Sequence, residues 1–148
     1  MATIHRFEDL NAWKKARQLV QALFEVTQQK PFAGDYDLVR QIRRASGSVM
    51  DNIAEGFGRG GRGEFVQFLS IAKGSVTEVK SQLYRAKDYG YLNEEDFGKL
   101  YEQADETAKI TDGLLMYLKE STMKGRKYAK EPEVIYQSSP YQTEDSQQ

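Results

Sequence analysis

Hydrophobic residues recur at steps of three and four along four segments of the chain, and polar residues occupy the positions between them. This spacing places the apolar side chains on one face of an α-helix. The four segments cover residues 9–30, 35–56, 63–89 and 93–121. In the second of them, the apolar stripe consists of Leu38, Ile42, Ala45, Val49 and Ile53. The pattern therefore predicts an all-α chain of four amphipathic helices.

The residues between the segments are typical of helix ends. Pro31 stops the first helix, because the residue before a proline resists the α conformation. Asp35 and Asn93 are predicted N-caps, since their side chains can accept the free amide hydrogens of a first helical turn. Gly90 is predicted to close the third helix in the left-handed conformation. Long helices with short connections favour antiparallel neighbours, so we expect an antiparallel up-down-up-down four-helix bundle.

The periodicity ends near Ser121 and divides the chain into two parts. Residues 1–121 form the predicted bundle. Residues 122–148 are rich in Lys, Glu, Ser, Gln and Tyr, and we expect them to form a polar, mobile tail. Tyr128, Tyr136 and Tyr141 are candidates for anchoring this tail to a partner surface.

Composition excludes several kinds of chemistry. The chain has no cysteine, which excludes thiol catalysis, zinc–thiolate sites and disulfides. Its one histidine, His5, leaves no pair of histidine ligands for a metal, and a Ser-His-Asp triad would need the N-terminal arm to supply it. We therefore expect no enzymatic activity, no metal site and no cofactor. The sequence shows no signal peptide and no apolar run long enough to span a bilayer, so we expect a cytoplasmic protein.

The aromatic and acidic residues of the helices do not indicate a catalytic site. The large aromatic side chains on the seams are predicted to be core residues: Trp13, Phe24, Phe65, Phe68 and Phe97. Four glutamates would form a carboxylate cluster only if they converged inside the bundle, and their helical positions predict solvated or paired side chains instead: Glu55, Glu78, Glu102 and Glu106.

Two helix faces indicate contact with further helices. A stripe of small residues lies opposite the seam of the third helix: Ser70, Gly74, Thr77 and Ser81. A glycine inside a helix costs close to ~1 kcal/mol relative to alanine, and small residues allow another backbone to approach closely. The fourth helix carries a second apolar stripe that includes Thr107, Ile110, Leu114 and Tyr117. We favour self-association through these faces; the alternative is that helices of the same chain cover both stripes.

The glycine-rich stretch from Gly56 to Gly63 literally matches the dinucleotide-binding pattern GxGxxG. That pattern needs a preceding strand and a βαβ unit, whereas a predicted helix precedes this stretch. The phosphate-loop pattern also fails, because Arg62-Gly63 stands where Lys-Ser or Lys-Thr is needed. Two interpretations remain. The glycines serve a tight chain reversal, which we favour, or Arg59 and Arg62 bind phosphate beside the N-terminus of the third helix.

Charge is segregated along the chain although it nearly cancels overall. Residues 38–62 contain five arginines against Asp51 and Glu55, and residues 91–120 contain eight acids against three lysines. The basic residues form a candidate surface for the phosphate backbone of nucleic acid: Arg40, Arg43, Arg44, Arg59, Arg62, Lys14 and Lys15. The same arginines are alternatively predicted to pair with the acidic fourth helix of their own or a neighbouring subunit. The overall acidic character slightly favours pairing.

Several sequence segments resemble one family, the four-helix-bundle proteins encoded in intervening sequences of bacterial 23S ribosomal RNA genes. The resemblance covers about residues 7–121. It rests on Trp13-Lys-Lys-Ala16, Leu38-Val-Arg-Gln-Ile-Arg-Arg-Ala45, Asn52-Ile-Ala-Glu-Gly56 with Gly58-Arg59, and Ala72-Lys-Gly-Ser75 with Glu78. It implies a homopentamer without enzymatic activity, and structural roles for Arg43, Arg44, Asn52 and Glu55. The chain is more distantly similar to the accessory protein of diversity-generating retroelements, a pentameric bundle that binds nucleic acid and its reverse transcriptase.

The sequence thus predicts a non-catalytic homo-oligomeric bundle, a pentamer by resemblance, that binds RNA or DNA through its basic residues. The alternative is a protein-interaction scaffold in which the arginines serve subunit contacts and the tail recruits a protein partner. The predicted subunit contacts are Ser70, Gly74, Thr77, Ser81, Ile110, Leu114 and Tyr117. No membrane partner is expected.

Overall fold

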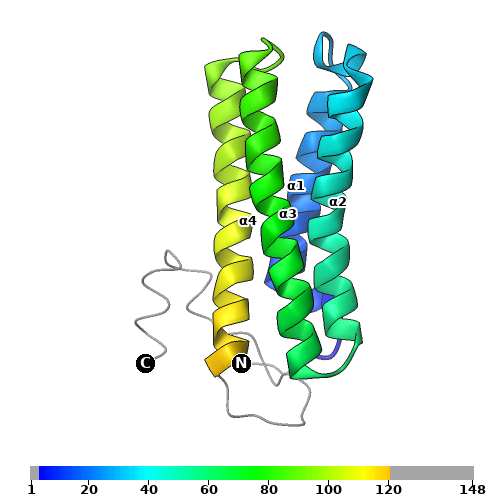
Figure 1. The fold of residues 1–148 in the computed structure, drawn as a ribbon, viewed down its shortest axis with the longest axis vertical. Helices are drawn as coiled ribbons and strands as arrows, with labels where there is room; N and C mark the ends of the chain where they lie inside the picture. The colour runs from blue at the N-terminus through cyan, green and yellow to red at the C-terminus, as the bar shows by residue number, and fades with distance from the viewer. Residues whose placement is uncertain (1–3, 121–148) are drawn as a thin grey trace.

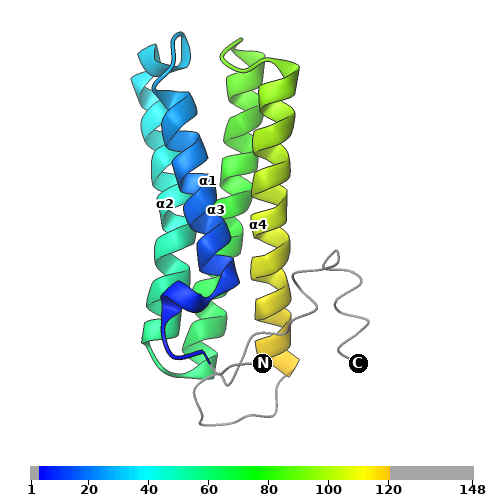
Figure 2. The same cartoon turned by 180° about the vertical axis from the view of Figure 1, so that it is seen from behind.

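The computed structural model describes residues 4–120. This part of the chain contains four α-helices, α1 (Asn11–Thr27), α2 (Tyr36–Gly58), α3 (Arg62–Asp88) and α4 (Glu94–Glu120), and two short 3-10 helices, Phe7–Asp9 and Phe32–Gly34. Successive helices run in opposite directions (Figures 1 and 2), α1 packs against α2 and α4, and α3 packs against the same two helices. The predicted all-α up-down-up-down bundle is confirmed. The predicted tail lies outside the described residues.

The predicted helix ends are confirmed in three places. The Leu38 N–H donates to Asp35 Oδ1 at 3.1 Å, and the Asp96 N–H donates to Asn93 Oδ1 at 2.7 Å. Gly90 follows α3 with a φ of 83°, in the left-handed region that glycine adopts most easily.

Asp35 also joins the two connections at one end of the bundle. The Tyr91 hydroxyl, from the α3–α4 connection, donates to Asp35 Oδ2 at 2.9 Å. The hydrogen bond from the Leu38 N–H, followed by that from Tyr91, lowers the pKa of Asp35 below its usual value. The same contact raises the pKa of Tyr91, because ionisation would remove the proton that it donates.

The first helix ends earlier than the sequence predicts, at Thr27 rather than Lys30. The Thr27 hydroxyl donates to the Leu23 carbonyl at 2.7 Å, so a side chain uses a carbonyl of the last turn. The next two amides donate to carbonyls three residues back, Gln28 to Glu25 and Gln29 to Val26. This tightening is common where a helix ends, and the restriction that Pro31 places on the preceding residue completes it.

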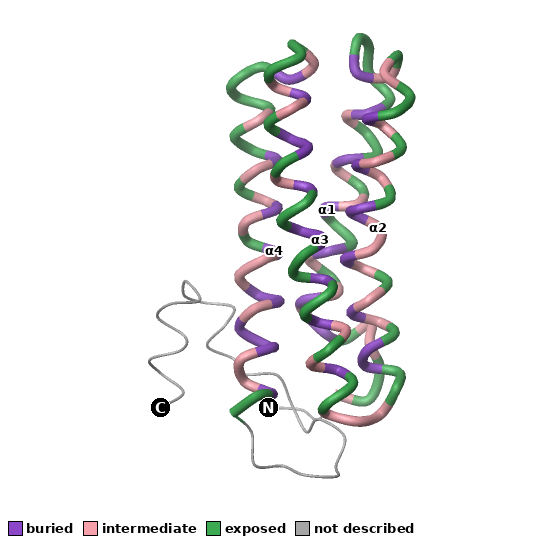
Figure 3. The backbone as a smooth tube through the Cα atoms, in the orientation of Figure 1, coloured by how far each residue is buried: buried purple, intermediate pink, exposed green. Residues whose placement is uncertain are grey.

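The core runs along the whole axis of the bundle, where the buried faces of the four helices meet (Figure 3). Phe65 is fully buried, as predicted. Trp13, Phe68 and Phe97 are only half-buried. The prediction is wrong for Phe24, which is 47% exposed, because its neighbour Leu23 occupies the core-facing position.

The α2–α3 contact is close at the C-terminal end of α2. A Cβ atom on Gly56 would lie 2.7 Å from Phe68 Cβ and 3.0 Å from Phe65 Cδ1, so this position has room only for glycine. Two turns earlier, Ser48 Oγ and Ser75 Oγ share a hydrogen bond of 2.9 Å, and Asn52 Nδ2 donates to the Ser48 carbonyl at 2.8 Å. The segment from Asn52 to Gly56 therefore fixes how α2 lies on α3.

Candidate functional site

The seven basic residues proposed from the sequence do not form one continuous surface. Two of them bind α4: Lys15 pairs with Glu106, and Arg62 Nη1 donates to the Leu118 carbonyl at 3.1 Å. The Arg62 contact places a cation on the last turn of α4, where the helix dipole favours positive charge. Both residues therefore contribute to holding the bundle together.

Arg43 connects the end of α1 to α2. Its Nε donates to Thr27 Oγ1 at 2.9 Å, and its guanidinium lies 4.5 Å from the centre of the Phe24 ring. The exposed Phe24 ring thus has a partner, the planar cation of Arg43. The structural role that the family resemblance implied for Arg43 is consistent with these contacts.

Arg59 is also engaged within its own chain. Its Nη2 pairs with Glu55 Oε2 at 2.8 Å, one helical turn earlier, and its guanidinium lies 5.1 Å from the Phe68 ring centre. The hydrogen bond from Arg59 to Glu55 raises the pKa of the arginine. Gly60, with a φ of 86°, reverses the chain between α2 and α3. These contacts favour the interpretation of the glycine-rich stretch as a turn.

Arg40 and Arg44 differ from these four residues. Both are exposed, and neither makes a hydrogen bond or ion pair with any residue between 4 and 120. They line a concavity of about 310 Å³ together with Asp37 and Gln41. Lys14, the seventh predicted residue, is likewise exposed. It lies ten residues before Phe24, the ring that Arg43 contacts, and so roughly 15 Å from the α2 arginines along the axis.

A further arginine, outside the seven basic residues predicted from the sequence, lies beside this concavity. Arg85 of α3 donates from Nη1 to Gln41 Oε1 at 3.2 Å, so it lies at the edge of the concavity that Arg40 and Arg44 line. Arg85 therefore lies beside Gln41, which lines the concavity together with Arg40 and Arg44. We call Arg40, Arg44 and Arg85 the arginine patch. Periodicity assigns Arg85 to a helix face but does not show which residue of α2 lies beside it.

The acidic residues of α4 pair mainly with lysines rather than with the α2 arginines. Lys73, Lys80 and Lys87 of α3 pair with α4 at 2.6, 2.7 and 3.0 Å, with Asp112, Asp105 and Glu94 respectively. The expectation that Arg40, Arg43 and Arg44 pair with the acids of their own fourth helix is therefore wrong. The seven-residue spacing of the three lysines could have predicted these ion pairs, because residues seven positions apart lie on the same edge of a helix.

The Lys80 ammonium, which hydrogen-bonds Asp105, lowers the pKa of that carboxyl, and Lys109 adds to the effect. Among the four glutamates considered above, Glu55 and Glu106 are paired, and Glu78 and Glu102 are exposed. Over residues 4–120, no group of three or more acidic or histidine side chains is arranged to hold a metal ion. Nor does any helix in this range have the length and apolar character needed to cross a membrane.

The two predicted contact stripes differ in the structure. Ser70, Gly74, Thr77 and Ser81 are exposed on α3, and a Cβ on Gly74 would meet no atom within 4 Å. On α4, by contrast, Ile110 and Leu114 are only 5% and 1% exposed, and Tyr117 is half-buried. The chain's own helices cover this second apolar stripe, since α4 packs against both α1 and α3. The α4 stripe therefore gives no reason to expect a second copy.

Comparison with known proteins identifies the family. The family model for the 23S rRNA-intervening sequence protein matches residues 8–113. The chain belongs to this family. The match to the 23S rRNA-intervening sequence protein family covers α1, α2 and α3 completely and ends within α4.

A solved structure is similar to this bundle. The crystal structure of a protein with unknown function from the S23 ribosomal protein family of Bacteroides thetaiotaomicron aligns with a TM-score of 0.65 and 18% identity. The alignment covers 70% of this chain and 97% of that one. At this identity the likeness supports the fold alone. No curated protein matches the chain.

Proposed function

We propose that this member of the 23S rRNA-intervening sequence protein family is a non-catalytic homo-oligomeric bundle that binds the phosphate backbone of RNA. The observation that carries the proposal is the exposure of Arg40 and Arg44, which have no partner in the part of the chain that the structure describes. The pentameric state is part of the proposal and rests on the family resemblance. Cytoplasmic location is likewise proposed.

The availability of these two arginines matters because a paired cation must give up its partner before it can bind phosphate. Arg40 and Arg44 are one turn apart on α2, so their Cβ atoms are about 5–6 Å from each other. Phosphate contacts release condensed counterions, and this makes binding depend steeply on salt. An RNA complex formed by the arginine patch should therefore weaken strongly as salt rises.

The RNA-binding test replaces both free arginines with alanine. For Arg40→Ala with Arg44→Ala, the slope of log affinity against log salt should fall by about 1.4–1.8, since two phosphate contacts are lost. The control removes two exposed cations of α4, Lys99→Ala with Lys119→Ala, and should leave the slope unchanged. Filter binding to a structured RNA measures both variants.

The same variants examine the second candidate, a scaffold whose arginines make subunit contacts. Because Lys15, Arg43, Arg59 and Arg62 make contacts within their own chain, Arg40 and Arg44 are the predicted arginines that this candidate would use between subunits. If the two α2 arginines serve subunits, their replacement disperses the assembly in sedimentation without affecting RNA. Absence of RNA binding by the unaltered protein at low salt rules out the first candidate.

The exposed stripe on α3 is the proposed contact between subunits. Gly74→Leu should reduce the native mass to that of smaller species, because its side chain would keep another backbone away from Ser70, Gly74 and Thr77. The isolated protomer should not lose stability, since the added Cβ meets no atom and leucine is the better helix former by up to ~1 kcal/mol. Native mass spectrometry and thermal melting separate the two effects.

The matched control for this variant is Gly98→Leu on α4. Gly98 is also an exposed helical glycine with no atom within 4 Å of an added Cβ. This variant should keep the native mass of the unaltered protein. An unchanged mass for Gly74→Leu would show that the α3 stripe is not a subunit contact.

A further inference from the structure

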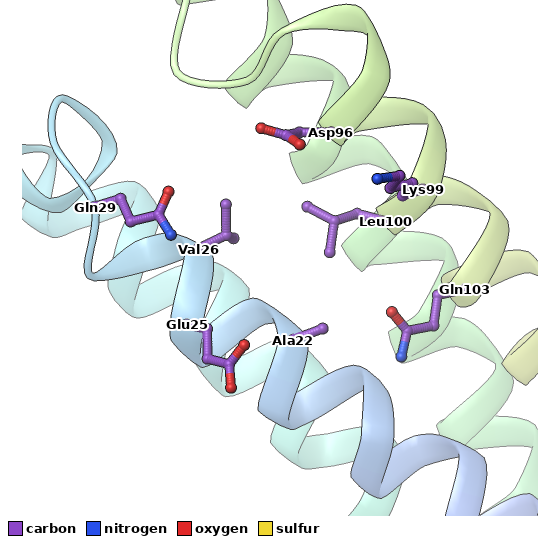
Figure 4. Close-up of a pocket in the computed structure, with 8 residues that line it drawn as sticks. All are labelled: Ala22, Glu25, Val26, Gln29, Asp96, Lys99, Leu100 and Gln103. Atoms are coloured by element: carbon purple, nitrogen blue, oxygen red, sulfur yellow. The ribbon is translucent and has the colours of Figure 1, made fainter.

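A cleft of about 310 Å³ lies between the C-terminal half of α1 and the beginning of α4. Val26 of α1 and Leu100 of α4 point toward one another across it, with Ala22 beside them (Figure 4). Polar side chains form its edges: Glu25, Gln29, Asp96, Lys99 and Gln103. Because α1 ends at Thr27 and α4 begins at Glu94, the cleft lies near the end of the bundle that holds the α1–α2 and α3–α4 connections.

The edges of the cleft carry unneutralised negative charge. Neither Glu25 nor Asp96 is paired with a cation from residues 4–120. Lys99, the one cation of the lining, pairs with Glu95 at 3.3 Å. A little farther along α4, Glu102 is exposed and also lacks a cationic partner within the described range. A fitting occupant therefore combines apolar side chains for the interior with positive charge for the approach.

The sequence that follows α4 has this composition in the required order. Residues 124–130, Lys-Gly-Arg-Lys-Tyr-Ala-Lys, contain four cations and no acid. Val134-Ile135-Tyr136 follows after Glu131-Pro132-Glu133 and is the one run of three apolar residues between 121 and 148, so residues 124–136 carry four cations against two acids. The chain thus carries its own candidate occupant for the cleft.

We propose that the cleft between α1 and α4 binds the Val134-Ile135-Tyr136 segment of the same chain, with the basic residues 124–130 passing the acidic side chains of α4 on the way. Val134, Ile135 or Tyr136 would cover the apolar surface of Val26 and Leu100. Lys130, ten residues after Glu120, would approach Glu102. The segment would then be bound to its own bundle at the end opposite the α2–α3 turn.

The chain is long enough for this arrangement. Glu120, the last residue of α4, is 17 residues beyond Gln103 and 24 beyond Asp96, which corresponds to about 26 and 36 Å along the helix. Val134 comes 14 residues after Glu120, and an extended segment of that length spans up to about 46–50 Å. The segment therefore reaches the full length of the cleft without being completely stretched.

The absence of native cysteine allows a direct test by disulfide trapping in the full-length protein. Under mild oxidation, Gln103→Cys with Ile135→Cys should form a disulfide within one chain. The control pair is Glu78→Cys with Ile135→Cys. Glu78 is exposed on α3 at nearly the same height, as the neighbouring Lys80–Asp105 ion pair indicates, and it is not among the proposed subunit-contact residues. The pair at the cleft should react at least tenfold faster than the control pair.

Charge reversal supplies the second measurement. Glu25→Lys with Asp96→Lys, added to the Gln103→Cys and Ile135→Cys chain, should slow trapping severalfold at low salt and much less at high salt. Thermal melting checks that this chain is folded.

Hydrogen exchange supplies a third measurement, in the cysteine-free protein. Exchange of the 134–136 amides should be slowed. The Ile135→Ser with Tyr136→Ser variant should expose the Val26 region to solvent, which the same measurement detects.

The outcomes divide clearly. Faster trapping within one chain at the cleft, together with slowed exchange of residues 134–136, supports the proposal. Equal trapping at Gln103 and Glu78 overturns it. Disulfide-linked dimers of the Gln103→Cys with Ile135→Cys protein would mean that the segment enters the cleft of another copy. This result also overturns the proposed binding within one chain.

Discussion

Replacing Phe65 with alanine is expected to lower the free energy of unfolding by about 3–5 kcal/mol. Phe65 is 0% exposed, and its ring contacts that of Phe57 edge-on with the centres 6.0 Å apart. It also lies against the backbone of α2 at Gly56. Removal of the ring would leave a cavity at the tightest helix contact, where neither helix can move inward easily. Urea denaturation followed by circular dichroism measures the loss.

Phe24→Ala is the matched control for this prediction, because the sequence pattern predicts both rings in the core. Phe24 is 47% exposed and its main described partner is the Arg43 guanidinium. Its removal should cost about 1 kcal/mol or less, the value of a partly exposed cation–ring contact. Equal costs for the two variants would contradict the assignment of Phe24 to the surface.

The contrast between Phe24 and Phe65 shows what periodicity can and cannot predict. The four helices, the capping roles of Asp35 and Asn93, and the closure at Gly90 depend on local chemistry, and the structure confirms them. Within α1, the strongly apolar Trp13 and Phe24 suggested the centre of the seam. The predicted seam of this helix also includes Ala16, Leu23 and Thr27, which are buried, and the structure adds Ala12 and Leu19. The true seam therefore passes beside the two large rings, because the geometry of the bundle, and not the size of the side chain, decides which positions lie inside.

The candidate site depends more strongly on how neighbouring helices are aligned along their axes. Charge counting identified a basic segment and an acidic helix, but it did not predict which side chains meet. Arg43 reaches Thr27, sixteen residues away, and Arg85 reaches Gln41, forty-four residues away. A sequence pattern predicts on which face of its helix a residue lies. It does not predict which residue of the neighbouring helix lies at the same level along the bundle axis. The arginine patch therefore depends on the alignment of α2 and α3 along their axes, which brings Arg85 beside Gln41.

The second large effect is expected where α2 and α3 approach most closely. Gly56→Leu should lower the free energy of unfolding by about 3 kcal/mol, the upper part of the range for overpacking a filled site. The new Cβ alone would lie 2.7 Å from Phe68 Cβ, an atom fixed to the backbone of α3 that no side-chain rotation can move away. Even Gly56→Ala should be destabilising, although alanine is favoured over glycine in a helix by about 1 kcal/mol.

Gly47→Ala provides the control on the same helix. Gly47 lies about two and a half turns earlier in α2, and a Cβ there would meet no atom within 4 Å. This variant should gain up to about 1 kcal/mol from helix propensity alone. The two alanine substitutions therefore have opposite expected signs in the same denaturation experiment. Stabilisation by both would show that α2 and α3 can separate at Gly56 without cost, and that the Asn52–Gly56 segment does not fix their packing.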